Sequence, residues 1–464
     1  MNILSLTEKK AIIWIGAVAL TLRIILNLTV ATNYTMSDGI VYHNIAVNLA
    51  SGNGYSMKTE PPFEPCFYRE PATSLFMSAV YLPYRLFGDL HYLTDNYSAD
   101  KYTEITCARF AMSLLGTATC IVFFLTIRQF FSLKLSFIIA ILASTYIPLA
   151  VFSNMLMREN MQTFAVVCMN YFFMLFILRK RLFWIFWFSA AWALSNMTLQ
   201  ITIYVIPFIF VFLLYYFREI RKSIIITGLT ISLMTIFISP WLIRSYVFSG
   251  DWRVIKTLGV SQTYEYMDYL RATGELKKAG LIDADSLRQL QHEWYAMPES
   301  AKFSLSYAGY FQEKASFLRA QIPKTGNESS QFIQRLRIFR NGWIESLWIS
   351  IKADGGLHAR PHALYLEKKE YFWLILSLSG FIFGYIAFIA MVIYYKRLLP
   401  MLLMFTFFFP LLIVLATEPR RALPIHLYIF MFSCLSFFYL YKRFICRMSH
   451  SDFTNAYVSG PGGL

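Results

Sequence analysis

Charged residues are scarce in this chain. Only 27 of its 464 residues are Asp or Glu, and charged residues of both signs make up 15%. Hydrophobic residues make up 57%, and many of them lie in long uninterrupted runs. About 20 apolar residues are enough to cross a hydrocarbon core of roughly 30 Å. The scarcity of charge therefore argues against a soluble protein and indicates an all-α polytopic membrane protein.

Other absences narrow the class further. The six cysteines show no metal-ligand spacing, and the chain shows no tandem repeat. No small-x-small cleavage site follows the first apolar run, from Ala11 to about Ala31, which is long for a signal peptide. We expect this run to be retained as the first helix. The net charge of +15 could point to nucleic acid, but the basic residues form short clusters between apolar runs, where they act first as topology signals.

These basic clusters recur at every second gap between the apolar runs. By the positive-inside rule, the clusters and the N-terminus face the cytoplasm, and the alternate gaps face the other side. The runs lie near residues 11–31, 105–127, 135–153, 160–178, 182–199, 201–217, 223–243, 372–395, 398–416 and 423–441, and the clusters within 128–134, 179–181, 218–222, 396–397 and 442–443.

Residues 72–87 are also apolar, and a crossing there would turn every later basic cluster outward. The stretch has only about 16 residues, with Pro83 and Arg85 near its end, which is short for a crossing. We therefore expect a juxtamembrane helix that lies in the interface. About ten transmembrane helices remain, with both termini inside and an outer first loop over residues 32–104.

The predicted domain organisation follows from this topology. Residues 1–243 form an N-terminal membrane region that contains the first loop and seven helices, and residues 244–371 form a small helical outer (periplasmic) domain. Residues 372–443 supply the last three helices, and residues 444–464 are a cytoplasmic tail.

Asp38 is the first candidate for chemistry, because it is an isolated acid just past the first helix. A carboxylate at the membrane face can act as a general base toward an acceptor hydroxyl. The alternative is that Asp38 caps a helix beginning at Gly39. Glu159, beside Arg158, lies between two apolar helices with almost no loop, where charges are costly and mark functional sites, unless the pair only neutralises itself.

Arginines are the candidates for binding a phosphate. Arg69, beside Glu70, lies where the first loop returns to the membrane, and its alternative role is an anchor to lipid headgroups. Arg244, Arg420 and Arg421 lie at outer helix ends, against the usual inward bias of basic residues. A lipid phosphate held at that face would explain them. A metal bound by His358 and His362, and a disulfide between Cys66 and Cys107, stay open as less favoured alternatives.

Several short motifs together resemble the GT-C integral-membrane glycosyltransferases, in particular the protein O-mannosyltransferase and lipid A aminoarabinose transferase family. The motifs span most of the chain in order: Ser37-Asp38-Gly39 with Tyr42, Gly52-x-Gly54-Tyr55, Tyr68-Arg69-Glu70-Pro71, Arg109, Arg158-Glu159-Asn160, Pro240-Trp241-x-x-Arg244 and Arg421-Ala422-Leu423-Pro424.

The resemblance implies an inverting transfer from a polyprenyl-phosphate sugar, with Asp38 and Glu159 as the catalytic acids and Arg69 at the donor phosphate. Tyr42, Glu70 and Arg158 belong to the same predicted substrate site. Two departures stand out: Gly39 replaces the second acid that many relatives have in the first loop, and Arg69 precedes Glu70 where the aminoarabinose transferase has a lysine after its glutamate. The resemblance implies a metal-independent or weakly metal-dependent transfer, with the polyprenyl-phosphate sugar as donor; a divalent metal stays open, although a metal-binding pair of acids is not expected in the first loop.

The sequence as a whole predicts a glycosyltransferase of the inner (plasma) membrane that acts at the outer face on a glycan, lipid or protein acceptor. One alternative is an O-antigen polymerase or ligase that uses a diphosphate-linked glycan. A lipid-linked sugar transporter is disfavoured, because the ionisable residues gather at one face and no inverted repeat is visible.

Overall fold

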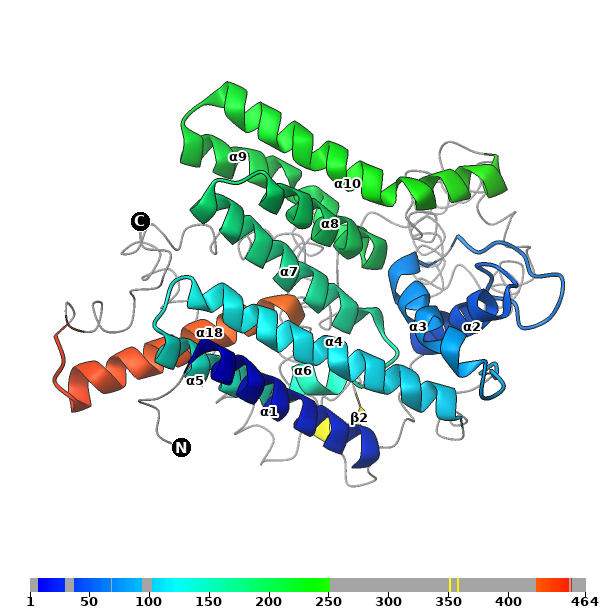
Figure 1. Ribbon diagram of the computed structural model, residues 1–464, viewed down its shortest axis with the longest axis horizontal. Helices are drawn as coiled ribbons and strands as arrows, with labels where there is room; N and C mark the ends of the chain where they lie inside the picture. Colours follow the sequence, from blue (N-terminus) through cyan, green and yellow to red (C-terminus); the bar gives the residue numbers. More distant parts are fainter. Residues whose placement is uncertain are drawn as a thin grey trace, which may run out of the picture. The chain divides into compact units, whose positions relative to one another are not determined.

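The computed structural model describes residues 7–29, 37–67, 69–93, 102–250, 350–351, 357–358, 423–449 and 452. The described residues are almost entirely helical (Figure 1). They divide between two compact units. The bundle unit contains residues 7–39, 102–235 and 423–449 among those described, and the loop unit contains residues 40–93 and 236–250.

The bundle unit is built from long apolar helices that pack side by side. In Figure 1, α1, α4 and α7 run alongside one another, and α7 also packs against α8. The elements are α1 (Glu8–Thr29), α4 (Thr103–Arg128), α5 (Leu133–Ser144), α6 (Ile147–Phe152), α7 (Arg158–Arg179), α8 (Phe183–Thr198), η3 (Gln200–Val205), α9 (Ile206–Phe217), the first part of α10 (Ile220–Ser249), α18 (Leu423–Leu440) and a π-helical turn, η7 (Tyr441–Ile445).

Two of the apolar runs are broken rather than continuous. The run near 135–153 divides into α5 and α6, and Pro148 lies in the first turn of α6. The run near 201–217 begins with the 3₁₀ helix η3 before α9, which has Pro207 in its first turn. Proline lacks the N–H that a helix interior needs but fits the first turn, so each proline marks where a new helix starts.

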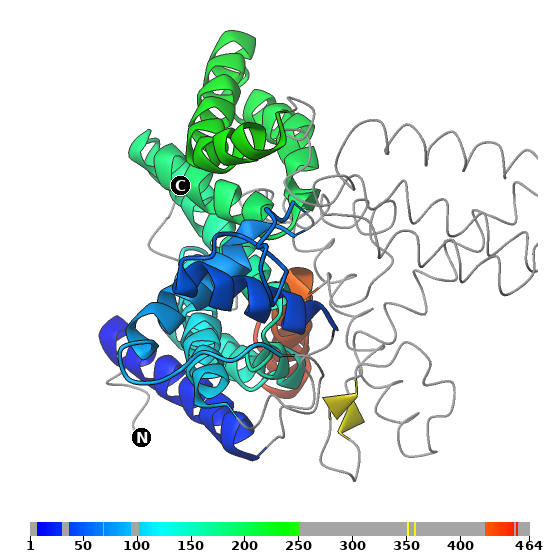
Figure 2. The same ribbon diagram turned by 90° about the vertical axis from the view of Figure 1, so that its right-hand side faces the viewer.

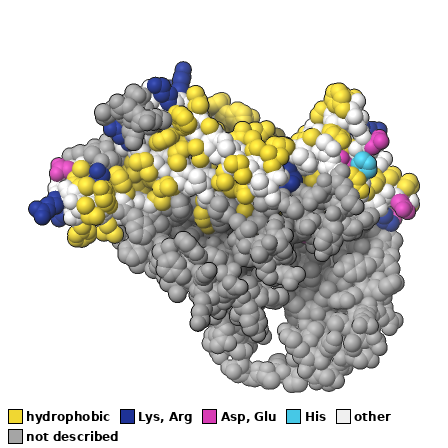
Figure 3. All heavy atoms as spheres, turned by 90° about the horizontal axis from the view of Figure 1, so that it is seen from below, with side chains coloured by type: hydrophobic (Ala, Val, Ile, Leu, Met, Phe, Trp, Pro, Cys, Tyr) yellow, Lys and Arg dark blue, Asp and Glu magenta, His cyan; other side chains and the backbone are white. Residues whose placement is uncertain are grey.

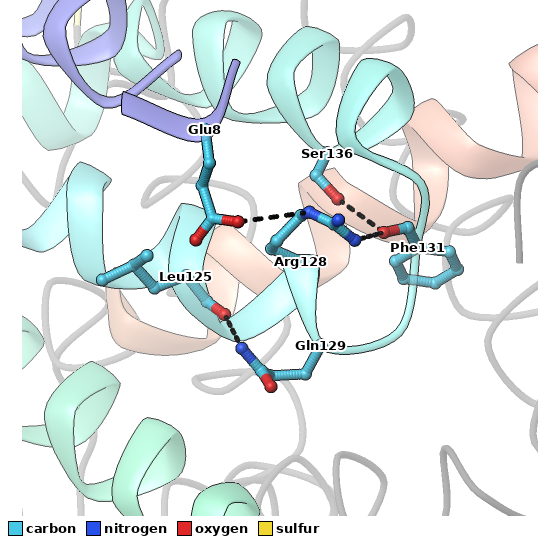
Figure 4. Close-up of polar contacts among 6 residues, drawn as sticks. All are labelled: Glu8, Leu125, Arg128, Gln129, Phe131 and Ser136. Carbon is cyan, nitrogen blue, oxygen red and sulfur yellow. Dashed lines mark hydrogen bonds and ion pairs between the residues drawn. The ribbon is translucent and has the colours of Figure 1, made fainter. Parts of the chain in front are cut away.

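The ends of the bundle helices group as the basic clusters predict. Glu8 at the start of α1 forms an ion pair with Arg128 at the end of α4, with Nε 3.8 Å from the carboxylate (Figure 4). The start of one helix therefore lies beside the end of the other, so the two helices are antiparallel. At the other end, Asn27 donates to Ser113 Oγ over 2.9 Å. The N-terminal segment and the basic cluster after α4 therefore share one end of the bundle.

The loop unit consists of two short helices, the segments around them, and the C-terminal part of α10. The helices are α2 (Ser37–Ser51), whose first three residues belong to the bundle unit, and α3 (Pro71–Tyr84); both are seen in Figure 2. Ser74 Oγ of α3 donates to the main-chain oxygen of Tyr42 in α2 over 3.1 Å. With 14 residues, α3 is only about 21 Å long, which is short for a crossing, as expected for residues 72–87.

Four described helices are long and apolar enough to cross a membrane: α1, α4, α7 and α10. Their outward faces carry exposed apolar side chains such as Trp14, Leu114 and Ile236. Figure 3 shows hydrophobic side chains over much of the visible described surface. This is the surface of a helical membrane protein, since water-exposed helices would carry polar residues there.

Some predictions fall on the undescribed part of the chain. The runs near 372–395 and 398–416 and most of the outer domain lie outside the described residues, so the count of about ten crossings stays a prediction. One departure from an all-α fold is visible: Ser350–Ile351 (β1) and Leu357–His358 (β2) pair as a short antiparallel ladder. Two residues per strand are too few to be recognised as a sequence pattern.

Candidate functional site

The first turn of α7 carries a buried pair of charged residues. Arg158 is 4% exposed and Glu159 is 3% exposed, and both belong to a helix long enough to span a membrane. Asn160 fixes this turn against α4 by donating to the main-chain oxygen of Met112 over 2.8 Å. Burying charge in an apolar bundle is costly, and the functional role of this pair, against simple neutralisation of one charge by the other, stays a prediction.

The segment that leads into this turn is held by polar side chains of α4. Arg109 Nε donates to the main-chain oxygen of Asn154 over 3.1 Å, and Ser113 Oγ contacts Asn154 Oδ1 at 3.0 Å. Both Arg109 and Asn154 are buried. The approach to Arg158 and Glu159 is therefore fixed by hydrogen bonds from two consecutive turns of α4.

Arg23 of α1 holds the same segment through Ser153. The contacts of Arg23, Arg109 and Ser113 with Ser153 and Asn154 are called the bundle junction. Its side chain is fully buried, and it donates from Nε to Ser153 Oγ over 3.0 Å and from one terminal nitrogen to the main-chain oxygen of Ala19 over 2.9 Å. Gly116 of α4 makes room for this contact, because a Cβ there would overlap Ser153 Oγ and lie 2.7 Å from Arg23 Nε. Arg23 therefore anchors Ser153, the residue before Asn154.

In the loop unit, the polar residues of α2 face inward and bind the surrounding segments. His43 Nε2 donates to the main-chain oxygen of His91 over 2.8 Å, which leaves Nδ1 to accept from Tyr81 Oη over 2.8 Å. The Asn44 amide makes two bonds of 2.9 Å to the main chain of Leu93. These contacts hold the segment after α3 against α2.

Asn48, one turn after Asn44, holds the segment on the other side of α2. Its amide nitrogen donates to the main-chain oxygens of Ser56 and Lys58 over 2.9 and 2.8 Å. Its amide oxygen accepts from Tyr92 Oη over 2.7 Å. The short helix α2 is thus the scaffold on which most of the first loop is built.

Arg69 and Glu70, the pair predicted at the end of the first loop, lie immediately before α3. The Arg69 guanidinium lies over the ring of Tyr42, 5.6 Å from its centroid, and is half-buried. Glu70 is 1% exposed and precedes Pro71, the first residue of α3. Three predicted site residues, Tyr42, Arg69 and Glu70, are therefore close together.

Tyr55 ties these residues to the rest of the loop. Its hydroxyl donates to the main-chain oxygens of both Arg69 and Glu70, over 3.1 Å each. Burial raises the pKa of Tyr55 well above its ordinary value of 10.0, and neighbouring Cys66 acts in the same direction. Tyr55 therefore stays protonated at neutral pH and remains able to donate.

Arg244, near the end of α10, is surrounded by aromatic rings rather than exposed as an open cation. Its guanidinium carbon lies 4.7 to 5.3 Å from four ring centroids, those of Trp241, Phe67, Phe248 and Tyr55. Its two terminal nitrogens donate to the main-chain oxygens of Cys66 and Tyr55 over 3.0 and 3.2 Å. Arg244 thus binds the backbone of the first loop, a contact that the sequence did not predict.

Asp38 is the second residue of α2 and is partly exposed. The alternative that it caps a helix starting at Gly39 is wrong, because the helix begins at Ser37 and Asp38 lies inside its first turn. A carboxylate in that turn is stabilised by the helix dipole instead.

Some of the other predicted site residues lie outside the described part of the chain. Arg420 and Arg421 lie outside the described residues, as does His362. Among the residues that the structure describes, no three His, Cys, Asp or Glu side chains gather as metal ligands. All six cysteines are free thiols, so the disulfide considered between Cys66 and Cys107 is absent.

The residues that the sequence analysis missed were visible as a pattern. His43, Asn44 and Asn48 interrupt an otherwise apolar helix, and polar residues on such a helix that are buried need partners. The same reasoning applies to Arg23 and Asn27, which are one turn apart on α1. Only the identity of the partners required the structure.

The solved structures that resemble this chain include two of ArnT from Cupriavidus metallidurans. The apo structure shares 14% identity and a TM-score of 0.41 with this chain, and the structure bound to undecaprenyl phosphate shares 13% and 0.39. Each match covers 91% of this chain and, respectively, 76% and 77% of the ArnT chain. No family model and no curated protein matches.

Both of these structural neighbours are ArnT structures. They belong to the group that the sequence motifs resemble. Both TM-scores lie below 0.5, so this likeness assigns no residue roles, which come from the chain's own contacts.

Proposed function

We propose that the chain is a GT-C type glycosyltransferase that moves a sugar from a polyprenyl-phosphate donor to an acceptor at the outer face of the membrane. The observation that carries the proposal is the buried Arg158–Glu159 pair at the start of α7, held in place by α4 and α1 within an apolar bundle. A buried charged pair in a membrane-length helix is by default a candidate for contact with a substrate. The sequence motifs add the reaction type.

The proposed reaction has Asp38 as general base. The acceptor hydroxyl gives its proton to the Asp38 carboxylate while its oxygen forms a bond to the anomeric carbon of the sugar. The bond from that carbon to the phosphate oxygen breaks on the opposite side, which inverts the configuration and releases the polyprenyl phosphate with the bonding electrons. Glu159 is the second acid in this proposal.

Arg69 is the proposed ligand of the departing phosphate. Its guanidinium lies over the Tyr42 ring, and the residue as a whole is half-buried. A planar guanidinium forms paired hydrogen bonds with phosphate oxygens and stabilises the charge that develops on them. Arg158, Arg420 and Arg421 are further candidates, and Glu70 is the other predicted member of the site next to Arg69.

The test uses purified protein in lipid nanodiscs with a radiolabelled monosaccharide on polyprenyl monophosphate. Cell-envelope lipid, glycan and protein fractions serve as acceptors. Replacing Asp38 by Asn or Glu159 by Gln is expected to lower transfer by roughly 10²-fold or more, the usual contribution of a general base. Asp89→Asn, at an exposed acid of the same loop, is the matched control and should be fully active.

Two outcomes would contradict the proposal. Full activity of Asp38→Asn would remove the assignment of the base. Consumption of a diphosphate-linked oligosaccharide, with the monophosphate-linked sugar left untouched, would identify a polymerase or ligase instead.

A further inference from the structure

We infer that Arg244 is a positioning residue, which closes the first loop and thereby places Arg69, rather than a ligand of the donor phosphate. The role of Arg69 as a phosphate ligand rests on the proposed function. The hold of Arg244 on the first loop, called the clamp below, rests only on contacts within the loop unit.

The clamp acts where the chain enters and leaves the loop formed by residues 55–66. This point, at Tyr55 and Cys66, is called the neck. The main-chain nitrogen of Cys66 donates to the main-chain oxygen of Tyr55 over 2.7 Å, so residues 55–66 leave and return at the same point. Arg244 donates to the main-chain oxygens of these same two residues, one from each terminal nitrogen. The forked guanidinium therefore bridges both strands of the neck, which a single ammonium group would not do.

The aromatic rings around Arg244 make the clamp specific. Trp241, one turn earlier on α10, packs edge-on against Tyr55 with ring centroids 4.7 Å apart, and it also lies beneath the guanidinium. Cation–π contacts are strongest where the cation is shielded from water. Two of the five guanidinium N–H groups are engaged by main-chain oxygens and four rings surround the guanidinium, so the contacts that Arg244 makes are with the loop itself.

The connection to Arg69 runs through Tyr55. The Tyr55 main-chain oxygen accepts from Arg244, and its hydroxyl donates to the main-chain oxygens of Arg69 and Glu70. The position of the Arg69 backbone therefore depends on Tyr55, which in turn depends on Arg244. Loss of Arg244 should loosen the loop neck and displace Arg69.

The first experiment measures the clamp without any sugar transfer. Lys58 is an exposed trypsin site inside the loop, and cleavage there follows the fraction of molecules in which the neck is open. In nanodiscs, Arg244→Gln should raise the rate of cleavage at Lys58, read by mass spectrometry, about tenfold or more, because two charge-assisted hydrogen bonds are lost. Arg244→Lys should open the loop nearly as much, and Tyr55→Phe, which keeps the neck bonds, far less.

The matched control is Arg221→Gln, at an exposed arginine in the first turn of the same helix, which should leave cleavage at Lys58 unchanged. An unchanged rate in both Arg244→Gln and Arg244→Lys would overturn the clamp. If Arg244→Gln does not fold, the Arg244→Lys variant decides the question alone.

The second experiment is a double-mutant cycle on transfer activity. If Arg244 acts through Arg69, Arg244→Gln should lower transfer strongly in the wild-type chain but hardly at all when Arg69 is already Ala. Independent, multiplying losses would overturn the positioning role and identify Arg244 as a direct phosphate ligand. Absence of transfer by the wild-type chain would instead remove the proposed function, while the cleavage rates at Lys58 still decide the clamp.

Discussion

Arg23 in the bundle unit and Arg244 in the loop unit each hold a segment that leads to predicted site residues, but the two arginines lie in different surroundings. Arg23 is fully buried between helices, with Ser153 Oγ and the main-chain oxygen of Ala19 as acceptors and Gly116 pressed against it. Arg244 is half-buried among aromatic rings and binds two loop carbonyls.

The difference indicates how freely each segment can move. If Arg23 lost its acceptors, a charge would remain without compensation in an apolar interior, which is strongly unfavourable. If Arg244 lost its acceptors, water could replace them at the surface of the loop unit, so opening costs less. We expect the segment before Arg158 and Glu159 to be rigid and the neck of the first loop to open and close.

The largest effect is expected from filling the space beside Arg23. A Cβ at position 116 would lie 2.7 Å from Arg23 Nε and overlap Ser153 Oγ, and the Arg23 side chain is fully buried. Gly116→Ala should therefore lower the free energy of unfolding by about 3 kcal/mol, through overpacking and the loss of a buried hydrogen bond. Unfolding of the purified protein by SDS in bicelles measures the change.

Gly228→Ala is the control, because nothing lies within 4 Å of a Cβ at that position of α10. This variant should be as stable as the original chain or more stable by about 0.5 kcal/mol, since Ala favours a helix. If Gly116→Ala behaves in the same way, the bundle junction is not the rigid region that the comparison requires.

The arrangement of the helices could largely be predicted from the sequence, because it depends on local patterns. Apolar length gave the candidate spans, and the basic clusters correctly grouped Arg128 with the N-terminal segment at one end of the bundle. Pro148 and Pro207 mark the breaks that the apolar runs concealed. Periodicity and proline act within one or two turns, so a single sequence contains their signal.

The contacts of the two arginines could not be predicted, because their partners are distant in the sequence. Ser153 is 130 residues from Arg23, and Cys66 is 178 residues from Arg244. The place of Arg244 at a helix end predicts a contact with a lipid phosphate. A helix end presents an arginine equally well to a main-chain carbonyl, and the contacts of Arg244 with Cys66 and Tyr55 depend on how the loop folds.

A smaller effect is expected from removing one acceptor of Arg23. Ser153→Ala leaves Arg23 Nε buried without its hydroxyl partner, which should cost about 2 kcal/mol of unfolding free energy. In an Arg23→Met background the same substitution should cost less than about 0.5 kcal/mol, because no charge remains to be satisfied. Equal costs in both backgrounds would show that Ser153 acts independently of Arg23, and that the bundle junction is not organised by this arginine.

The smallest effect is expected at the other end of the same bundle, where Glu8 and Arg128 pair near the surface (Figure 4). The Glu8 side chain is 50% exposed and the two groups are 3.8 Å apart, so solvent screens their attraction. Glu8→Gln should change the free energy of unfolding by less than about 0.5 kcal/mol, and the change should vanish in high salt. Arg128→Ala should cost more, because Arg128 also donates to the main-chain oxygen of Phe131 over 2.9 Å and so fixes the turn between α4 and α5. A loss of several kcal/mol in Glu8→Gln would mean that this end of the bundle is as tightly constrained as the bundle junction around Arg23. The contrast between the fully buried Arg23 and the half-buried Arg244 would then no longer explain which segments move.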